Sequence, residues 1–245
     1  MSEPNRIDRI TVGDESDKGA GEAFDLSVWI PDQGSGVGVL LLQEIFGVGA
    51  YIKAVAARLA RDGFVVAAPD LFWRLHPNWA PDHDEAGLGA SFELVQKFDM
   101  ASGVSDSLAC LAHLRDMPEV RGSVGVLGFC LGGTVAHLVA AAGDPDAVVA
   151  YYGSGVADAI DQLGAIDCPV QYHFGTADPF IANDDVEKVQ AAVEATGRDD
   201  LEVVRQPGAG HAFDNHEAPQ FHDAIAAASA WAATQRFLTD HLRLA

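Results

Sequence analysis

Short apolar runs alternate with amphipathic stretches along most of the chain. The apolar runs are typical of strands that are buried on both faces of a sheet. Predicted strands of this kind lie at Val37–Leu42, Phe64–Ala68, Val124–Phe129, Ala147–Tyr152, Val170–Phe174 and Leu201–Val204. Strands that alternate with helices predict a mostly parallel sheet flanked by helices on both faces, which is an α/β fold.

The helices between these strands are predicted from apolar residues at helical spacing. One helix carries Ile52, Val55, Ala56 and Leu59 on one stripe and ends at Gly63. Asp184 with Glu187 resembles a capping box and starts another helix, which ends at Gly197. Further helices are predicted at Ala101–Arg115, Val135–Ala142 and Gln220–Arg243. The inner face of the last is predicted to carry Phe221, Ile225, Ala228, Trp231 and Leu238.

Two stretches of the chain are less regular, residues 7–30 and residues 70–98. Ile7–Val12 predicts a weak strand, and Phe24–Ile30 alternates as an antiparallel edge strand does before Pro31 stops it. Residues 70–98 are irregular and rich in aromatic side chains. This excursion is either a wall for a substrate or a surface segment packed by its own aromatics. Because no linker, repeat or low-complexity segment divides the chain, residues 1–245 are predicted to form a single domain.

Composition narrows the function classes. The chain has 36 acidic and 15 basic residues, a formal net charge of −21, which argues against nucleic acid or an anionic membrane as partner. Met1–Arg9 is polar and no apolar stretch reaches about 18 residues, so we expect a cytoplasmic protein. The three cysteines show no CxxC spacing, so neither a disulfide framework nor a metal site is expected. The sequence does not indicate an oligomeric state.

A cysteine stands where a strand turns sharply into a helix. Gly128 and Gly132 flank Cys130 in a Gly-x-Cys-x-Gly turn, the setting of a nucleophile elbow, where serine is usual. Side chains at the two glycines would collide where strand and helix approach. A core cysteine is the alternative interpretation, and it is the one we adopt for Cys110 and Cys168. A nucleophilic thiol also needs a base or a lowered pKa.

The chain offers one residue for each supporting role. Asp178 follows the strand Val170–Phe174, and His211 lies in a glycine-containing loop after the last strand. Nucleophile, acid and histidine come in the order found in α/β-hydrolases. The alternatives are a turn residue for Asp178 and a backbone-bonded loop histidine for His211. His137 and His173 are predicted to be buried structural residues, and the remaining histidines to be surface residues: His76, His83, His113, His216, His222 and His241.

Four separated motifs together resemble the dienelactone hydrolase family of the α/β-hydrolase superfamily. They are Gly128–Gly133, Gln43–Gly47, Gly175–Asp178 and Gly210–Phe213, and the resemblance covers about residues 24–240. It implies a Cys130, Asp178, His211 triad that needs no cofactor. It also implies that Glu44 lies near the thiol and assists formation of the thiolate when substrate binds; the alternative is a solvated loop carboxylate. A carboxylate there would disfavour a resting thiolate.

The remaining site residues follow from this arrangement. The backbone N–H groups of Leu131 and Ile45 are expected to form the oxyanion hole, and Phe46, Arg74, Tyr152 and Ala212 are candidates for substrate contact. Family members bind a substrate carboxylate with two arginines, but Asp84–Gln96 and Ala212–Glu217 contain none. The predicted substrate is therefore a small, less charged ester or lactone, or a thioester. A catalytically silent binding protein and a redox-active cysteine protein are the alternatives.

Overall fold

The computed structural model describes residues 3–13 and 21–245. Met1 and Ser2, which begin the polar stretch used to predict location, lie outside the described residues. The chain divides into two compact units, Met1–Val124 with Leu244–Ala245, and Gly125–Arg243. The single-domain organisation expected from the sequence stays a prediction.

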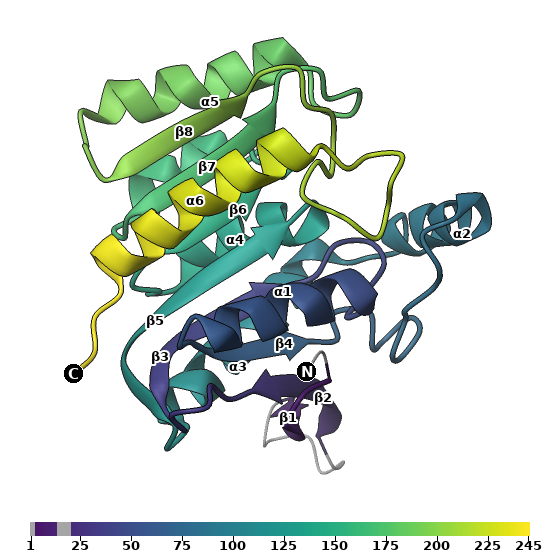
Figure 1. Cartoon of the computed structure of the whole chain (residues 1–245), viewed down its shortest axis with the longest axis vertical. Coiled ribbons are helices and arrows are strands. Elements are labelled where there is room, and N and C mark those ends of the chain that lie inside the picture. The colour runs from purple at the N-terminus through teal and green to yellow at the C-terminus, as the bar shows by residue number, and fades with distance from the viewer. Residues whose placement is uncertain (1–2, 14–20) are drawn as a thin grey trace. The chain divides into compact units, whose positions relative to one another are not determined.

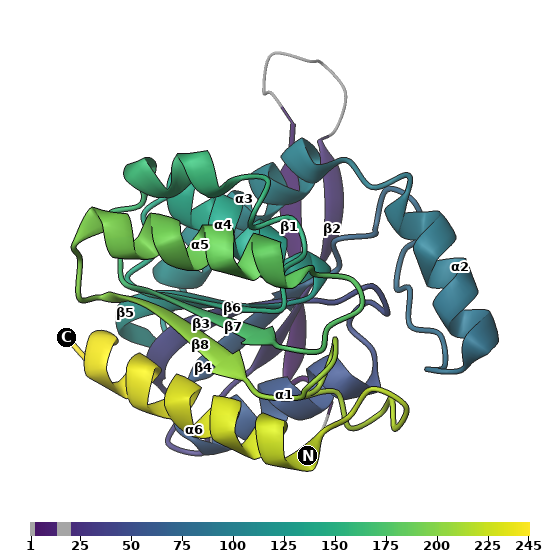
Figure 2. The same cartoon turned by 90° about the horizontal axis from the view of Figure 1, so that it is seen from above.

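The first unit holds a sheet covered on both sides by helices. Its strands pair in the order β1-β2-β4-β3, and helices α1 and α3 lie on opposite faces of β3 and β4 (Figure 2). Strand β3 is buried along its whole length, as a strand with a helix on each face must be. The elements are β1 Arg6–Val12, β2 Glu22–Trp29, β3 Gly36–Leu42, α1 Ala50–Arg61, β4 Val65–Pro69, α2 Glu85–Val95 and α3 Met100–Asp116.

The second unit repeats this plan with parallel strands. Strands β5 to β8 pair in sequence order and in parallel (Figure 1), and strand β5 begins in the first unit. Helices α4 and α5 cover one face of these strands and α6 the other (Figure 2). The elements are β5 Val120–Phe129, α4 Leu131–Ala142, β6 Val148–Tyr151, η1 Ile160–Ala165, β7 Val170–Gly175, α5 Asn183–Thr196, β8 Leu201–Gln206 and α6 Ala224–His241.

The parallel strands explain where the polar residues of interest stand. Cys130 follows β5, Asp178 follows β7 and His211 follows β8, each just beyond the carboxyl end of its strand. Parallel strands bring their carboxyl ends to the same edge of a sheet, where α/β proteins bind ligands. Glu44 holds the corresponding position after β3 in the first unit. The predicted α/β class with helices on both faces is confirmed.

Several local predictions were wrong. Strand β2 is antiparallel as predicted but not an edge strand, because β1 pairs along it. The excursion contains a helix, α2, whose start is capped by the Asp84 side chain accepting from Gly87 N. Helix α5 begins at Asn183 after an Ala182 cap that makes no side-chain hydrogen bond. Asp184 therefore lies inside the first turn, and no capping box forms.

The C-terminal helix is shorter than predicted, and only its first turns differ from the predicted inner face. Asp223 caps α6 by accepting hydrogen bonds from Ile225 N and Ala226 N, each at 3.0 Å. Ile225, which we expected on the inner face, is 85% exposed. Trp231 and Leu238 are buried as predicted, and Ala226 and Ala230 complete the buried stripe at the start of the helix. The apolar Ile225 side chain misled the prediction because the cap, not hydrophobicity, sets where this helix starts.

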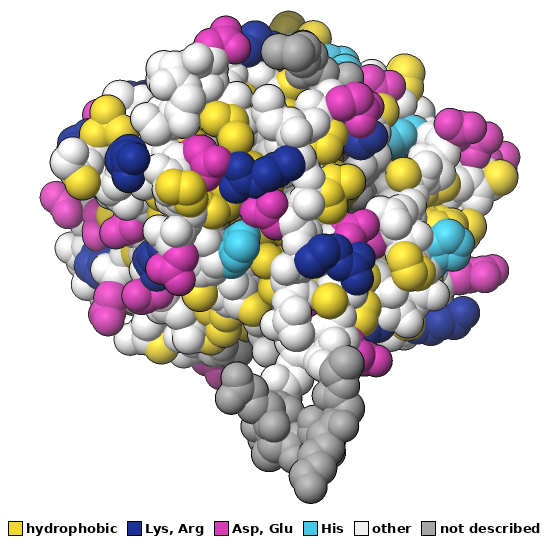
Figure 3. Space-filling model, turned by 90° about the horizontal axis from the view of Figure 1, so that it is seen from below, with side chains coloured by type: hydrophobic (Ala, Val, Ile, Leu, Met, Phe, Trp, Pro, Cys, Tyr) yellow, Lys and Arg dark blue, Asp and Glu magenta, His cyan; other side chains and the backbone are white. Residues whose placement is uncertain are grey.

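The surface carries both signs of charge despite the acidic composition. On the face in Figure 3, Lys and Arg side chains lie among Asp and Glu side chains, with apolar side chains between them. Within residues 3–13 and 21–245, no helix combines the length and apolar character that crossing a bilayer requires.

Candidate active site

The turn after β5 has the backbone of a nucleophile elbow. Cys130 adopts φ 52° and ψ −114°, a conformation that costs an L-residue about 1–3 kcal/mol and is characteristic of functional sites. A Cβ on Gly128 would lie 2.0 Å from the Gly132 carbonyl oxygen, so strand and helix can approach only without a side chain there. Cys130 N donates to Tyr151 O at 3.0 Å. The strained turn is thus fixed from both sides and presents the thiol at the start of α4.

The structure brings Cys130, His211 and Asp178 together in one line. His211 Nε2 lies 3.2 Å from Cys130 Sγ, and His211 Nδ1 donates to Asp178 Oδ2 at 2.8 Å. The other carboxylate oxygen of Asp178 accepts from Phe180 N at 2.8 Å and Ile181 N at 3.2 Å. The carboxylate is therefore held from behind while it orients the imidazole. This is the order of contacts that nucleophilic catalysis requires.

Charge around His211 favours its protonated form. Burial by itself lowers the pKa of His211, but the Cys130 thiolate and the Asp178 carboxylate outweigh it and raise the pKa from 6.5 to about 10. Opposite charges within hydrogen-bond distance stabilise an imidazolium. The geometry therefore supports proton exchange between the thiol and the histidine, with Asp178 stabilising the positive charge.

Aromatic rings surround the imidazole. The Tyr152 ring lies 5.1 Å from His211 and is fully buried, so its expected substrate contact stays a prediction. Phe180 meets His211 edge to face at 5.2 Å and is 51% exposed. Ala212, another expected contact, has a positive φ of 54° and is buried. An exposed apolar ring beside the histidine offers a surface suited to an apolar substrate group.

In the first unit, the Glu44 carboxylate is buried against a histidine. Glu44 is only 2% exposed, which contradicts the alternative of a solvated loop carboxylate. His83 Nε2 donates to Glu44 Oε1 at 3.1 Å, and the His83 side chain is 7% exposed. We predicted His83 to be a surface residue, and that was wrong. A buried carboxylate requires a partner, but nothing in the sequence indicates which residue of the excursion supplies it.

The loop that follows Glu44 is held by the same excursion. The Phe46 ring stacks on His83 with centroids 4.1 Å apart, and Trp79 Nε1 donates to Ile45 O at 3.2 Å and to Ser91 Oγ at 3.2 Å. A Cβ on Gly47, which has φ +71°, would lie 1.8 Å from Trp79 O. The aromatic-rich segment thus packs directly on the Gln43–Gly47 motif.

Arg74 and Leu131, two other predicted site residues, are held by contacts within the fold. Arg74 pairs with the buried Asp106 through both guanidinium nitrogens and lies 4.1 Å over the Trp73 ring. That engagement gives Arg74 a structural partner, and its expected substrate contact stays a prediction. Leu131, the expected oxyanion residue of the second unit, is buried in the first turn of α4.

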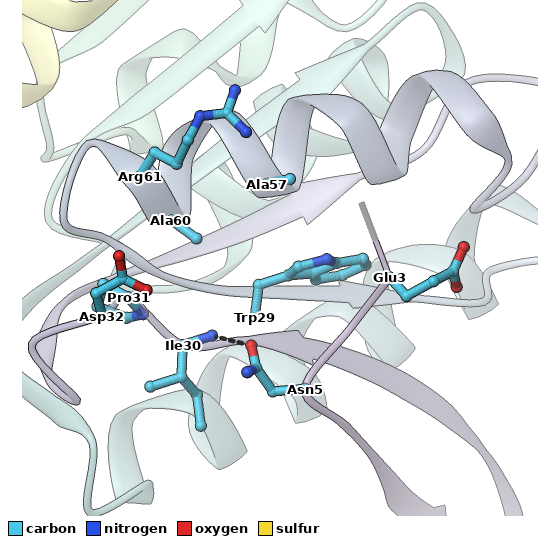
Figure 4. A pocket seen from close by; sticks show the side chains of 9 residues that line it. All are labelled: Glu3, Asn5, Trp29, Ile30, Pro31, Asp32, Ala57, Ala60 and Arg61. Atoms are coloured by element: carbon cyan, nitrogen blue, oxygen red, sulfur yellow. Dashed lines mark hydrogen bonds between the residues drawn. The ribbon is translucent and has the colours of Figure 1, made fainter. Parts of the chain in front are cut away.

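Within residues 3–13 and 21–245, no three His, Cys, Asp or Glu residues are placed to hold a metal ion. A pocket of about 230 Å³ in the first unit contains none of the predicted site residues (Figure 4). It is lined by Glu3, Asn5, Trp29, Ile30, Pro31, Asp32, Ala57, Ala60 and Arg61.

Comparison with known proteins gives one consistent family. The profile of the dienelactone hydrolase family matches residues 24–242. The chain is 33% identical over 213 residues to a carboxymethylenebutenolidase of Pseudomonas sp. (strain P51), covering 86% of this chain and 88% of the relative. It is 34% identical over 195 residues to a carboxymethylenebutenolidase of Pseudomonas putida, covering 79% and 81%.

Solved structures agree on the fold. A crystal structure from Klebsiella pneumoniae, provisionally described as a dienelactone hydrolase, matches with a TM-score of 0.76 at 26% identity and covers 96% of this chain and 97% of that one. A dienelactone hydrolase-like promiscuous phosphotriesterase from metagenomic libraries matches with a TM-score of 0.78 at 24% identity, covering 97% and 99%. The fold is that of α/β-hydrolases, and this chain belongs to the dienelactone hydrolase family.

Proposed function

We propose that the protein hydrolyses a small ester or lactone through a thioacyl-enzyme formed on Cys130. The contact line from Cys130 Sγ through His211 to Asp178 carries this proposal. The naming of its relatives as carboxymethylenebutenolidases supports a lactone as the substrate class.

The first half of the reaction acylates the cysteine. His211 Nε2 takes the proton of the Cys130 thiol. Cys130 Sγ then attacks the acyl carbon, forming a C–S bond while the carbonyl electron pair moves to oxygen. The backbone N–H groups of Leu131 and Ile45 are the proposed donors to this oxyanion, as residues that follow β5 and β3. When the intermediate collapses, the C–O bond breaks and His211 Nε2 donates a proton to the leaving oxygen. For a lactone, the leaving group stays attached as the hydroxyl end of the same molecule.

The second half regenerates the thiol. His211 takes a proton from water, whose oxygen attacks the thioester carbon. The C–S bond then breaks to release the acid, and His211 Nε2 returns the proton to Cys130 Sγ. Asp178 keeps the imidazole in the tautomer with a proton on Nδ1. Glu44, through the resemblance to the family, is proposed to assist thiolate formation when substrate arrives. No external oxidant, reductant or cofactor enters these steps.

The substrate is proposed to be less charged than a carboxylate-bearing lactone. A bidentate arginine is the usual means of binding a carboxylate, and Asp84–Gln96 and Ala212–Glu217 contain no arginine. The half-exposed Phe180 ring beside His211 supports an apolar acyl group. Thioesters fit the same mechanism, and we retain them as the second candidate class because their acyl carbon accepts the same nucleophile.

The test is turnover of p-nitrophenyl acetate, simple lactones and acyl thioesters by wild-type protein and Cys130→Ala. We expect the wild type to hydrolyse at least one class and the variant to lose that activity. Unchanged turnover in the variant would exclude the proposed nucleophile. Absence of turnover on the whole panel, together with no labelling of Cys130 by an ester probe, would favour the catalytically silent binding protein.

A further inference from the structure

Glu44 occupies an environment that is costly for a carboxylate without a defined partner. It is 2% exposed, at the end of a strand that is buried on both faces. Removing a charged group from water costs several kcal/mol unless hydrogen bonds replace the lost solvation. His83 Nε2 supplies such a bond at 3.1 Å. The direction in which the Glu44 side chain points therefore depends on where His83 is held.

His83 is itself held by two neighbours in sequence and space. It immediately precedes Asp84, which caps α2 by accepting from Gly87 N at 2.8 Å, and its ring stacks on Phe46 at 4.1 Å. The cap fixes the backbone next to His83, and the stack fixes the plane of its ring. Both constraints aim Nε2 at the glutamate, so the imidazole is oriented before any substrate binds.

Trp79 fixes the backbone of the same loop. Its indole N–H donates to Ile45 O at 3.2 Å, and its carbonyl lies where a Cβ of Gly47 would be. The loop is thus constrained at the Glu44 side chain, the Ile45 carbonyl, the Phe46 ring and the Gly47 backbone. We call residues 79–91 the clamp segment, because each of these constraints comes from it.

We propose that His83 is a positioning residue for the hydrolytic reaction, acting by holding the Glu44 carboxylate within a loop that the clamp segment keeps rigid. This rests on the proposed function, in which Glu44 assists the thiol. It assigns the excursion at residues 70–98 a role in ordering catalytic groups, beyond forming a wall. His83 acts only through Glu44 and does not itself take part in bond making.

The test compares His83→Ala and His83→Gln with the wild type. Alanine removes the donor, and we expect kcat to fall about tenfold, the size of one charge-assisted hydrogen bond, while KM stays within about twofold. Glutamine places an amide N–H near the position of imidazole Nε2, so we expect it to restore kcat to within about threefold of wild type. A residue that served only to pack the fold would not show this rescue by a polar, non-aromatic side chain.

A double-mutant cycle with Glu44→Ala separates positioning from general damage. If His83 acts through Glu44, His83→Ala has no further effect on kcat in the Glu44→Ala background. A matched control is His113→Ala, which removes another histidine–carboxylate pair of the first unit, His113 Nε2 to Asp8 Oδ2 at 3.0 Å. We expect the control to leave kcat and KM unchanged.

The outcomes distinguish this inference from the proposed function. If His83→Ala lowers kcat equally with and without Glu44, or if it leaves kcat unchanged while Cys130→Ala abolishes turnover, the positioning role is wrong and the cysteine mechanism stands. If Cys130→Ala retains turnover, the proposed function itself fails. Circular dichroism and thermal unfolding of each variant confirm that the folded protein is being compared.

Discussion

Among the described residues, each compact unit contains a buried histidine–carboxylate pair, and the two pairs differ in what surrounds them. In the second unit, His211 donates to Asp178 at 2.8 Å and also lies 3.2 Å from a thiol. In the first unit, His83 donates to Glu44 at 3.1 Å and stacks on Phe46. In the first arrangement the histidine lies where it can exchange a proton with the thiol, whereas in the second it contacts a carboxylate and a phenyl ring.

The comparison also shows two ways in which a fold orders a reactive group. Asp178 and His211 each follow a strand, so the sheet itself brings them to Cys130. Glu44 follows a strand too, but its partner comes from a segment 39 residues further along the chain. Each region is closed by a glycine pressed against a carbonyl, Gly128 on Gly132 and Gly47 on Trp79.

The largest effect is expected when the pair of the second unit is broken. His211→Ala removes the proposed base for the thiol proton, and we expect kcat to fall about 10⁶-fold, the size found for a base that acts as one unit with its nucleophile. Because His83 is proposed only to position a carboxylate, His83→Ala should lose far less. Steady-state kinetics on the best ester or lactone substrate measure both. An equal loss of activity in His211→Ala and His83→Ala would contradict the proposed difference between the two pairs.

The next effect concerns the carboxylate that orients His211. Asp178→Asn keeps the shape of the side chain but offers an N–H where the imidazole needs an acceptor, which favours the wrong tautomer. We expect kcat to fall about 10⁴-fold with little change in thermal stability. Kinetics and unfolding curves of the same preparation check this. A loss of less than about tenfold would show that Asp178 is a turn residue and not a catalytic partner.

A smaller effect is expected at the clamp of the first unit. Gly47→Ala forces an L-side chain into φ +71° and against Trp79 O at 1.8 Å, and we expect a loss of about 2–4 kcal/mol in the free energy of unfolding. Gly89→Ala is the matched control, because a Cβ on Gly89 in helix α2 would meet nothing within 4 Å. It should stabilise the protein by about 0.5–1 kcal/mol. Denaturant unfolding measures both, and similar values for the two would mean that the clamp does not constrain the loop.

The smallest change is a shift in protonation. The pKa of His211 is raised from 6.5 to about 10 partly by the Cys130 thiolate, so we expect Cys130→Ala to lower it. Since the folded-state pKa lies above 6.5, the interaction stabilises the fold fully below pH 6.5 and is lost as the pH rises through about 10. An NMR titration of the His211 ring proton in wild type and variant measures the shift. The same pKa in both would show that the thiol does not interact with the imidazole.

The sequence could predict those features of the fold and the site that depend on neighbouring residues in the chain. The turn at Gly128–Gly132, and the positions of Asp178 and His211 after strands, follow from glycine sterics and strand patterns. Helix α2 was missed because Gly87 and Gly89 lower helix propensity, and its Asp84 cap was seen only in the structure. The partner of Glu44 was missed because a long-range contact from an irregular segment leaves no periodic pattern. Burial of Glu44 implies that its carboxylate has a partner, but burial alone does not identify His83 as that partner.

The exposed Ile225 and the absent capping box at Asp184 share one physical cause. Helix starts depend on which side chain meets the first free N–H groups, and several polar residues compete for that role. The Asp223 side chain caps α6, whereas no side chain caps α5. A sequence pattern therefore placed both helices but misplaced their first turns.

The most direct measurement of the central claim is the mass of the protein during turnover of p-nitrophenyl acetate. The reaction is quenched with acid within the first turnover and the protein is digested for peptide mapping. We expect the added mass of one acetyl group on Cys130 in the wild type and no such adduct in Cys130→Ala. Hydrolysis at an unchanged rate in Cys130→Ala, or acetyl transfer to a different residue during turnover, would contradict it.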